Sequence, residues 1–211
     1  MNIAKDILEA HHDFVGATHL VEVEGLSSPQ VCNFLNRLVA AMDPGDTYLE
    51  IGTWKGLTLC SAAHGNVGKL CYACDKFRFW GKFTGPGVLA KWSLYRNVDR
   101  YSKGGAQVRF FHTTSQKLFA QKLVPPRVRV YFYDGDHSYE GTYHGVVAAA
   151  PLLTDSSILL MDDWNDPVIR KATYDGIRDA GLTIEWERHL EGGHDTGGWW
   201  NGLAVFHLLR G

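Results

Sequence analysis

The 211-residue sequence contains no run of about 18 apolar residues, so no transmembrane helix is expected. Its first residues, MNIAKDILEAHHDF, place acids and histidines where a signal peptide needs an apolar stretch, so we expect a cytoplasmic protein without a membrane partner. Neither sign of charge dominates, because 21 Lys and Arg oppose 23 Asp and Glu, for a formal net charge of −2. Without a basic stripe to neutralise phosphates, nucleic acid is not an expected partner.

Cysteine is scarce, with four residues in the chain. Cys71 and Cys74 form a C-x-x-C pair, which suggests a redox or zinc site. The pair lies in an apolar run that predicts a strand, however, and residues three apart on a strand point to opposite faces. Redox pairs need a helix N-terminus, and zinc would need two more ligands that no second pair offers. We therefore expect buried, reduced cysteines.

Hydrophobic residues make up 45% of the chain and charged residues 21%, and this length suits one core, so we expect a single domain over residues 1–211. Residues 1–26 are weakly patterned and are expected to form a lead-in or a lid. Strands are then predicted at 48–51, 69–74, 108–112, 128–133, 158–161, 182–188 and 203–209. Helices are predicted at 29–42, 89–97, 116–123, 138–153 and 167–180, and another helix follows the first strand and its glycine turn and ends at about residue 64. This alternation predicts a doubly wound α/β fold with a mostly parallel seven-stranded sheet and a C-terminal antiparallel hairpin.

Acidic residues fall at the ends of several predicted strands. In parallel sheets, ligands bind in the crevice at the carboxyl ends of the strands. Asp75 follows the second predicted strand and Asp134 the fourth, while Asp162 and Asp163 follow the fifth. These residues mark the expected binding site.

The first strand leads into Glu50-Ile51-Gly52-Thr53-Trp54-Lys55-Gly56. Gly52 allows a tight turn, and Gly56 allows close approach of a ligand or of the strand. The spacing differs from the G-x-G-x-x-G of dinucleotide sites, which disfavours a nicotinamide-dependent oxidoreductase. The Glu50 carboxylate would repel a pyrophosphate but suits a cationic ligand with an amino group. Asp75, 23 residues after Gly52, can accept hydrogen bonds from both hydroxyls of a ribose.

Over nearly its whole length, the chain resembles class I S-adenosylmethionine-dependent methyltransferases. Residues 50–56 resemble their first motif, Asp75 matches their ribose acid, and Ser115 in FHTTSQKL matches the position that contacts the adenine. The resemblance implies S-adenosylmethionine as cofactor. The implied cofactor-binding residues are Glu50, Gly52, Thr53, Trp54, Gly56, Asp75, Ser115 and Asp134.

Three acids are expected to converge, because neighbouring parallel strands lie about 4.8 Å apart. Asp134, Asp162 and Asp163 would repel one another without a cation, and oxygen ligands favour Mg²⁺, Ca²⁺ or Mn²⁺. The pattern resembles the metal-dependent O-methyltransferase branch, namely the macrocin-type enzymes and, more distantly, the catechol-type enzymes. In that branch the three matching acids hold one divalent cation.

Two residues compete for the role of general base in that resemblance. His137 occupies the base position of some sugar enzymes, and Asp136 matches the acid proposed in other relatives. Structural alternatives stay open: Asp136 as a helix cap, His137 as a packed imidazole and Asp163 as a turn residue.

The acceptor implied by the resemblance is a small molecule with a hydroxyl group, such as a sugar, a natural product or a phenol. Trp164 and Asn165 are expected to touch it, and Trp199 or Trp200 either stacks on it or covers the sheet edge. Residues 77–92 are a second candidate lid. A cephalosporin-hydroxylase-like relative and a non-catalytic S-adenosylmethionine-binding module are the alternative functions, and a homo-oligomer stays open.

Overall fold

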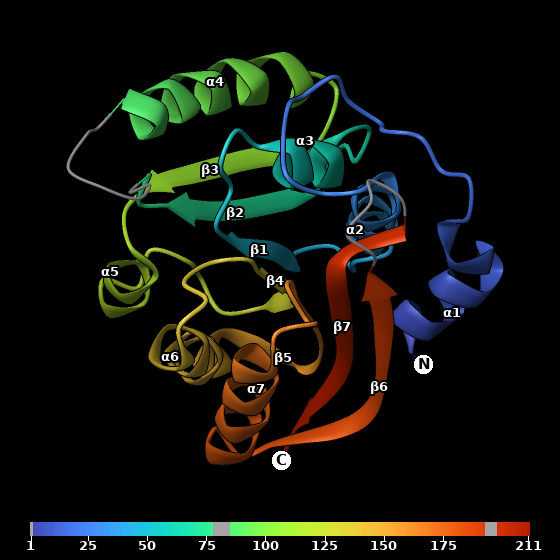
Figure 1. Cartoon of the computed structure of the whole chain (residues 1–211), viewed down its shortest axis with the longest axis vertical. Coiled ribbons are helices and arrows are strands. Elements are labelled where there is room, and N and C mark those ends of the chain that lie inside the picture. Colours follow the sequence, from blue (N-terminus) through green and yellow to red (C-terminus); the bar gives the residue numbers. More distant parts are fainter. Residues whose placement is uncertain (1, 78–84, 193–197) are drawn as a thin grey trace.

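A seven-stranded sheet with the order β3-β2-β1-β4-β5-β7-β6 forms the centre of the computed structural model, which describes residues 2–77, 85–192 and 198–211 (Figure 1). The strands are β1 Thr47–Ile51, β2 Leu70–Asp75, β3 Gln107–His112, β4 Val128–Tyr133, β5 Leu153–Met161, β6 Leu182–Gly192 and β7 Gly198–Arg210. Strands β1 to β5 pair in parallel, whereas β7 is antiparallel to both β5 and β6. The predicted doubly wound sheet with its C-terminal antiparallel hairpin is confirmed.

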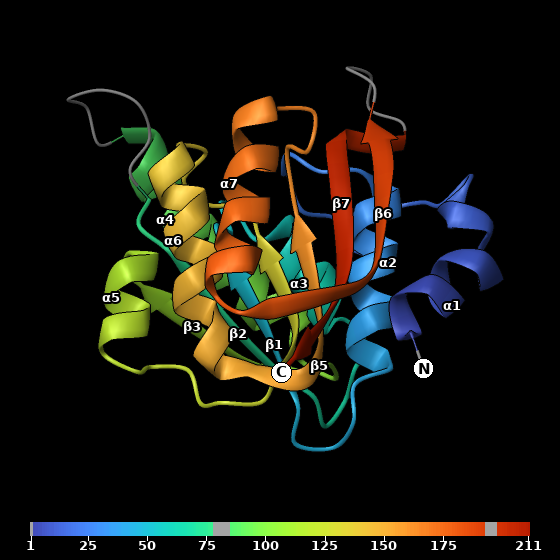
Figure 2. The same ribbon diagram turned by 90° about the horizontal axis from the view of Figure 1, so that it is seen from below.

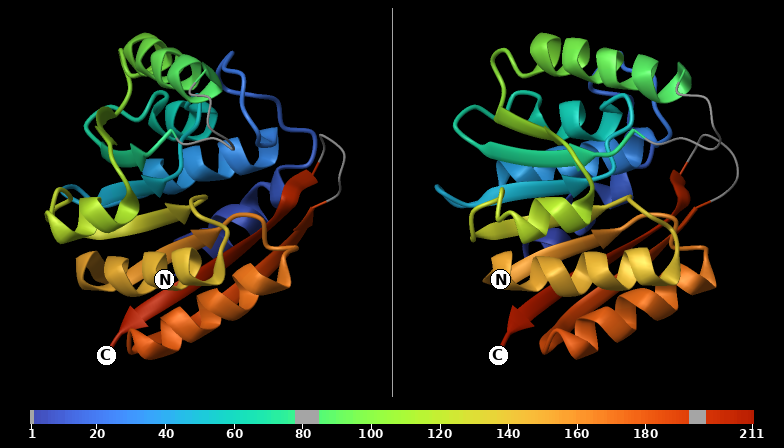
Figure 3. Two further views of the ribbon diagram at one scale, coloured as in Figure 1. Left: turned by 60° about the vertical axis from the view of Figure 1, so that its left-hand side comes forward. Right: turned by 90° about the vertical axis from the view of Figure 1, so that its left-hand side faces the viewer.

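Helices cover both faces of the sheet (Figure 2). They are α1 Ile3–Ala10, α2 Pro29–Ala40, α3 Leu57–Ala63, α4 Gly85–Tyr101, α5 Ser115–Ala120, α6 Tyr139–Ala149 and α7 Pro167–Asp179, with 3-10 turns η1 His12–Phe14 and η2 Ala150–Leu152. Helices α6 and α7 lie side by side on one face (Figure 3). In the described part of the chain, none of the helices is both long and apolar enough to span a bilayer.

The sheet separates two hydrophobic cores. One core packs α1 to α4 against one face, and its largest fully buried side chains include Phe34 and Phe132. The other packs α5 to α7 against the opposite face around Tyr131 and Phe206. A sheet covered on both faces explains why β1 is buried at all five positions rather than alternating.

All four cysteines are buried and unpaired, as the sequence predicts. Cys71 and Cys74 lie in different cores, on opposite faces of the sheet. Burial raises the pKa of the Cys74 thiol to about 12, which keeps it protonated and unreactive.

Several segments differ from the sequence prediction. Strand β6 continues to Gly192 and β7 begins at Gly198, so the hairpin strands are longer than the predicted 182–188 and 203–209. Residues 3–10, expected within a lead-in, form the amphipathic helix α1, which buries Ile3, Ala4 and Leu8 in the first core. Strand β5 begins at Leu153, five residues earlier than predicted. Its first residues are mostly polar and follow the end of a predicted helix, so the sequence pattern does not indicate a strand there.

The chain between α1 and α2 crosses the start of α3. Glu24 pairs with Lys55 at 2.6 Å, and a Cβ on Gly25 would lie 2.5 Å from the Leu57 Cβ. This close approach brings residues 25–27 to the carboxyl end of the sheet.

Candidate functional site

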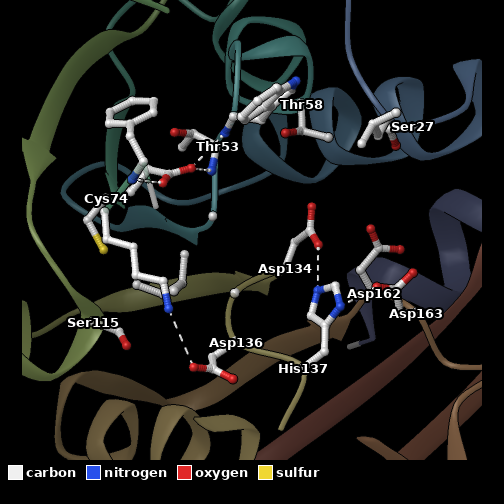
Figure 4. Close-up of a pocket in the computed structure, with 18 of the residues that line it drawn as sticks. Ser27, Thr53, Thr58, Cys74, Ser115, Asp134, Asp136, His137, Asp162 and Asp163 are labelled. Atoms are coloured by element: carbon white, nitrogen blue, oxygen red, sulfur yellow. Dashed lines mark hydrogen bonds and ion pairs between the residues drawn. The ribbon is translucent and has the colours of Figure 1, made fainter. Parts of the chain in front are cut away.

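A cavity of about 680 Å³ opens at the carboxyl ends of β1, β2, β4 and β5 (Figure 4). This size suits a small-molecule site. The loops after these strands supply most of its wall. The rest comes from residues 25–27, from the start of α3, from residues 113–116 after β3 and from the start of β7. Of the residues singled out from the sequence, the wall contains Gly52, Thr53, Trp54, Asp75, Ser115, Asp134, Asp136, His137, Asp162, Asp163 and Trp200.

The turn after β1 depends on Gly52. Its φ of +88° lies in the left-handed region, and its N–H donates to the Cys74 carbonyl at 2.9 Å. A Cβ at this position would lie only 1.8 Å from the Asp134 carbonyl oxygen. Only glycine lets the turn pass this close to the loop after β4, so both loops can face one cavity.

Asp75 fixes the same turn from the end of β2. Its Oδ2 accepts hydrogen bonds from the backbone N–H groups of Thr53 at 3.0 Å and Trp54 at 2.8 Å. Its Oδ1 accepts one from the Phe77 N–H at 2.6 Å. A carboxylate has about four acceptor sites, so Asp75 keeps capacity for a ligand in the cavity.

The structure places Glu50 behind the cavity wall rather than on it. Its carboxyl is fully buried and accepts hydrogen bonds from the Tyr48 hydroxyl at 2.6 Å and the Thr58 hydroxyl at 2.8 Å. Burial raises the pKa of Glu50 to about 8, although both hydrogen bonds oppose that shift. Thr58 itself lines the cavity, so its hydroxyl connects the buried Glu50 carboxyl to the cavity wall.

Gly56 also lies off the cavity wall. It is the residue before α3, with a φ of +89°, and a Cβ there would lie 2.5 Å from the Leu94 Cδ1. Its close approach is to helix α4, not to the cavity.

Asp134, His137 and Asp163 offer one ligand atom each, and all three atoms lie within 4.8 Å of one another. The His137 Nδ1 is 3.1 Å from Asp163 Oδ2, and its Nε2 is 3.6 Å from Asp134 Oδ1 (Figure 4). We call these three residues the cation cluster. Asp162 is not part of it, yet it lines the cavity, is 5% exposed, and its Oδ1 has no hydrogen-bond partner.

Electrostatics reflect the crowding of these acids. Burial raises the pKa of Asp134 to about 6, against the hydrogen bond from His137, which lowers it. Burial and the neighbouring Asp134 and Asp163 carboxylates hold the pKa of Asp162 well above its usual range. The hydrogen bond to Asp134 raises the pKa of His137. Positive charge at this point is therefore favoured.

Asp136 faces away from the cation cluster (Figure 4). Its carboxylate lies 3.5 Å from Lys76 Nζ and accepts a hydrogen bond from the Ser138 N–H at 3.0 Å. That backbone hydrogen bond lowers the pKa of Asp136. The cap of α6 is Ser138, whose hydroxyl accepts from the Gly141 N–H at 3.0 Å, so the alternative of Asp136 as the helix cap is wrong.

The acceptor expectations need correction at Trp164. This side chain is 3% exposed and packs on Tyr174 and Phe206, so it does not reach the cavity. Trp199 is also core, in edge contact with Phe14 and Phe34, whereas Trp200 lines the cavity. Residues 193–197, and residues 78–84 of the second candidate lid at 77–92, lie outside the described residues.

Sequence reasoning missed Ser27 and Asn201, which both line the cavity. Ser27 is 6% exposed, and its hydroxyl has no hydrogen-bond partner. The Asn201 Nδ2 donates to Asp163 Oδ1 at 2.8 Å. Neither residue belongs to a sequence motif. Each lies far along the chain from the strand-end residues of the cavity, so only the tertiary structure brings it to the site.

Comparison with known proteins gives the same fold. The O-methyltransferase from Bacillus cereus, solved in complex with SAH, is 16% identical with a TM-score of 0.62; the match covers 99% of this chain and 90% of that one. TrmN from Thermus thermophilus is 19% identical with a TM-score of 0.59; the match covers 89% of this chain and 50% of that one, so this chain spans about half its length. TYW2 from M. jannaschii, in complex with AdoMet, is 10% identical with a TM-score of 0.57; the match covers 85% of this chain and 76% of that one. No curated protein sequence matches this chain.

A family model described as a methyltransferase domain matches residues 49–164, which is more than half of the 211 residues. The matched segment begins in β1 and ends just after Asp162 and Asp163, so it contains the Gly52 turn, Asp75 and the whole cation cluster. The chain belongs to this methyltransferase-domain family.

Proposed function

We propose that the protein transfers a methyl group from S-adenosylmethionine to a hydroxyl of a small molecule, with a divalent cation in the cation cluster. One observation carries the proposal: the Gly52–Asp75 turn and the cation cluster face the same cavity in a methyltransferase fold. An O-methyltransferase among the structural neighbours supports the choice of oxygen as the methylated atom.

The residues of the cavity fit the methyl donor. Asp75 keeps acceptor capacity for ribose hydroxyls, and Ser115 lines the cavity on the same side, where the adenine would lie. The buried hydroxyls of Ser27 and of Thr53, which lies in the turn beside Asp75, have no hydrogen-bond partner. Buried polar groups are normally paired, so these two hydroxyls suit the polar amino-acid end of the donor.

The cation cluster fits a divalent ion. The carboxylates of Asp134 and Asp163 supply ligand atoms close together, and Asp162, with its unpartnered Oδ1, lies beside them. Carboxylates alone can therefore hold the ion, while the His137 imidazole serves as the base. When bound, S-adenosylmethionine would supply an electrophilic methyl group, and the cation would lower the pKa of a coordinated hydroxyl.

The chain itself would orient the acceptor and move a proton. We propose His137 rather than Asp136 as the general base, because its two ring nitrogens lie 3.1 Å from Asp163 and 3.6 Å from Asp134. Asp136 is turned toward Lys76, and its lowered pKa makes it a weaker base. Trp200 and Asn201 form the wall nearest the cation cluster on the β7 side, where an acceptor ring would be held.

The test measures binding and transfer separately. Calorimetric titration with S-adenosylmethionine is expected to give saturable binding in EDTA, and radiolabelled methyl transfer to a panel of sugars and phenols is expected only with Mg²⁺ or Mn²⁺. The variant Asp134→Asn is expected to lose about 100-fold or more in rate, since a cation supplies several kcal/mol to the transition state. Asp155→Asn, an exposed acid on the same sheet, serves as control. The proposal fails if the donor does not bind or if transfer is equally fast in EDTA.

A further inference from the structure

Asp163 sits in the turn after β5 with a φ of +52°, a backbone conformation that non-glycine residues rarely adopt. Its two carboxylate oxygens have different partners. Oδ2 lies 3.1 Å from the His137 Nδ1, whereas Oδ1 accepts the hydrogen bond from the Asn201 Nδ2 at 2.8 Å. The side chain is thus held at both oxygens, in the orientation that completes the cation cluster.

The start of β7 has a backbone conformation that brings Asn201 to this point. Trp200 and Gly202 on either side have φ values of +54° and +92°. A Cβ on Gly202 would lie 2.6 Å from the Asn165 Oδ1, so a side chain here would have to displace the Asn165 amide. The distortion lies beyond the last regular β5–β7 pair, Met161 with Ala204.

Backbone hydrogen bonds clamp this part of β7 to the turn that carries Asp163. The Trp164 N–H donates to the Gly202 carbonyl, and the Asn165 N–H donates to the Asn201 carbonyl, both at 3.0 Å. The Asn165 side chain donates onward to the Gly192 carbonyl at the end of β6. Asn201 and Asp163 therefore cannot separate without breaking main-chain contacts.

We infer that Asn201 is a positioning residue, which fixes the Asp163 carboxylate for cation binding through the Nδ2–Oδ1 hydrogen bond. The inference rests on the proposed function, because it needs a cation in the cluster. Asn201 lies outside residues 49–164, so the family model does not assign it. Outer hydrogen-bond partners of metal ligands contribute in this way: their loss costs about 10- to 100-fold in metal affinity.

Calorimetric titration of the full chain with Mn²⁺ tests the inference on wild type, Asn201→Leu and Asn201→Gln. The Leu variant keeps approximate size but donates nothing, and it is expected to bind Mn²⁺ about 10- to 100-fold more weakly. The Gln variant keeps an amide donor and is expected to recover part of that loss. Affinity for S-adenosylmethionine in EDTA is expected to be unchanged in both variants, which a general loss of structure would not allow. If thermal unfolding shows that the Leu variant does not fold, Asn201→Ala, which also donates nothing, replaces it.

The outcomes separate the two proposals. If wild type binds Mn²⁺ and the donorless variant binds it equally well, Asn201 has no positioning role, but the proposed function stands. If wild type binds S-adenosylmethionine but no Mn²⁺, the cation part of the proposed function fails, and this inference fails with it. If high Mn²⁺ restores methyl transfer in the Leu variant, the defect lies in cation affinity, as inferred.

Discussion

Two walls of the cavity are built in different ways. The turn wall, residues 52–54 with Asp75, is held by backbone groups, since the Asp75 carboxylate accepts three main-chain N–H groups. The cation wall, formed by the cation cluster and Asn201, is held by side chains from the loops after β4 and β5 and from β7. The first wall is local to one pair of adjacent strands, whereas the second needs three strands in register.

The difference teaches how each wall responds to change. A wall made of backbone geometry tolerates almost no substitution at its turn, because an added atom meets main chain that cannot move aside. A wall made of side chains can lose one partner and keep its backbone, so its defects are expected in ligand affinity rather than in stability.

The largest expected effect is at Gly52, where the two walls touch. Gly52→Ala would add a Cβ 1.8 Å from the Asp134 carbonyl oxygen at a φ of +88°. The left-handed conformation costs about 1–2 kcal/mol in an L-residue and overpacking about 1–3 kcal/mol, so we expect a loss of about 2–5 kcal/mol in the free energy of unfolding. Urea denaturation measures it.

Gly104→Ala is the matched control for that substitution. Its φ of +79° is similar, but nothing lies within 4 Å of the added Cβ, so only the conformational cost of about 1–2 kcal/mol applies. Equal losses in the two variants would mean that the close approach of the walls contributes nothing.

A smaller effect is expected at Asp75, which sharpens the claim that backbone contacts hold the turn wall. In Asp75→Asn, one accepting oxygen becomes an amide donor and faces a backbone N–H. Hydrogen bonds to charged groups contribute about 1.5–3 kcal/mol, and we expect a destabilisation in that range together with weaker donor binding. Lys76→Ala, at the exposed neighbour, controls for general changes in the loop. Weaker binding without destabilisation would show that Asp75 serves the ligand and not the turn.

The two walls also differ in how far the sequence predicts them. Gly52 and Asp75 could be placed because a glycine turn and a strand-end acid are local patterns with a fixed topological meaning. The positions of Asp134, Asp162 and Asp163 at strand ends could be predicted, but not that His137 would join Asp134 and Asp163 while Asp162 stayed apart. That choice depends on the left-handed turn at Asp163 and on Asn201, which arrives from a strand 38 residues later.

Glu50 exposes another limit of the sequence pattern. Its position in the strand before the turn was predicted correctly. The sequence pattern does not show, however, that the hydroxyls of Tyr48 and Thr58 bind its carboxylate away from the cavity. Glu50 was expected on the cavity wall, but it is buried behind that wall, and local sequence spacing does not predict this burial.

Per unit of pH, the smallest expected effect concerns the pH dependence of stability at Glu50. Glu50 has a pKa of about 8 in the folded chain, against about 4.3 in an unfolded one, so the folded state binds more protons between these values. The free energy of unfolding should therefore fall as pH rises from about 4.5 to 8, by at most about 1.4 kcal/mol per pH unit from this group. Glu50→Gln removes the titration, and the difference between wild type and variant, measured by urea denaturation at each pH, isolates it. The exposed Glu140→Gln should run parallel to wild type. If the free energies of unfolding of wild type and Glu50→Gln change with pH in parallel, Glu50 is ionised in the folded chain at neutral pH and acts as a charge behind the turn wall. If the two free energies converge as pH rises, Glu50 acts there as a neutral hydrogen-bond partner.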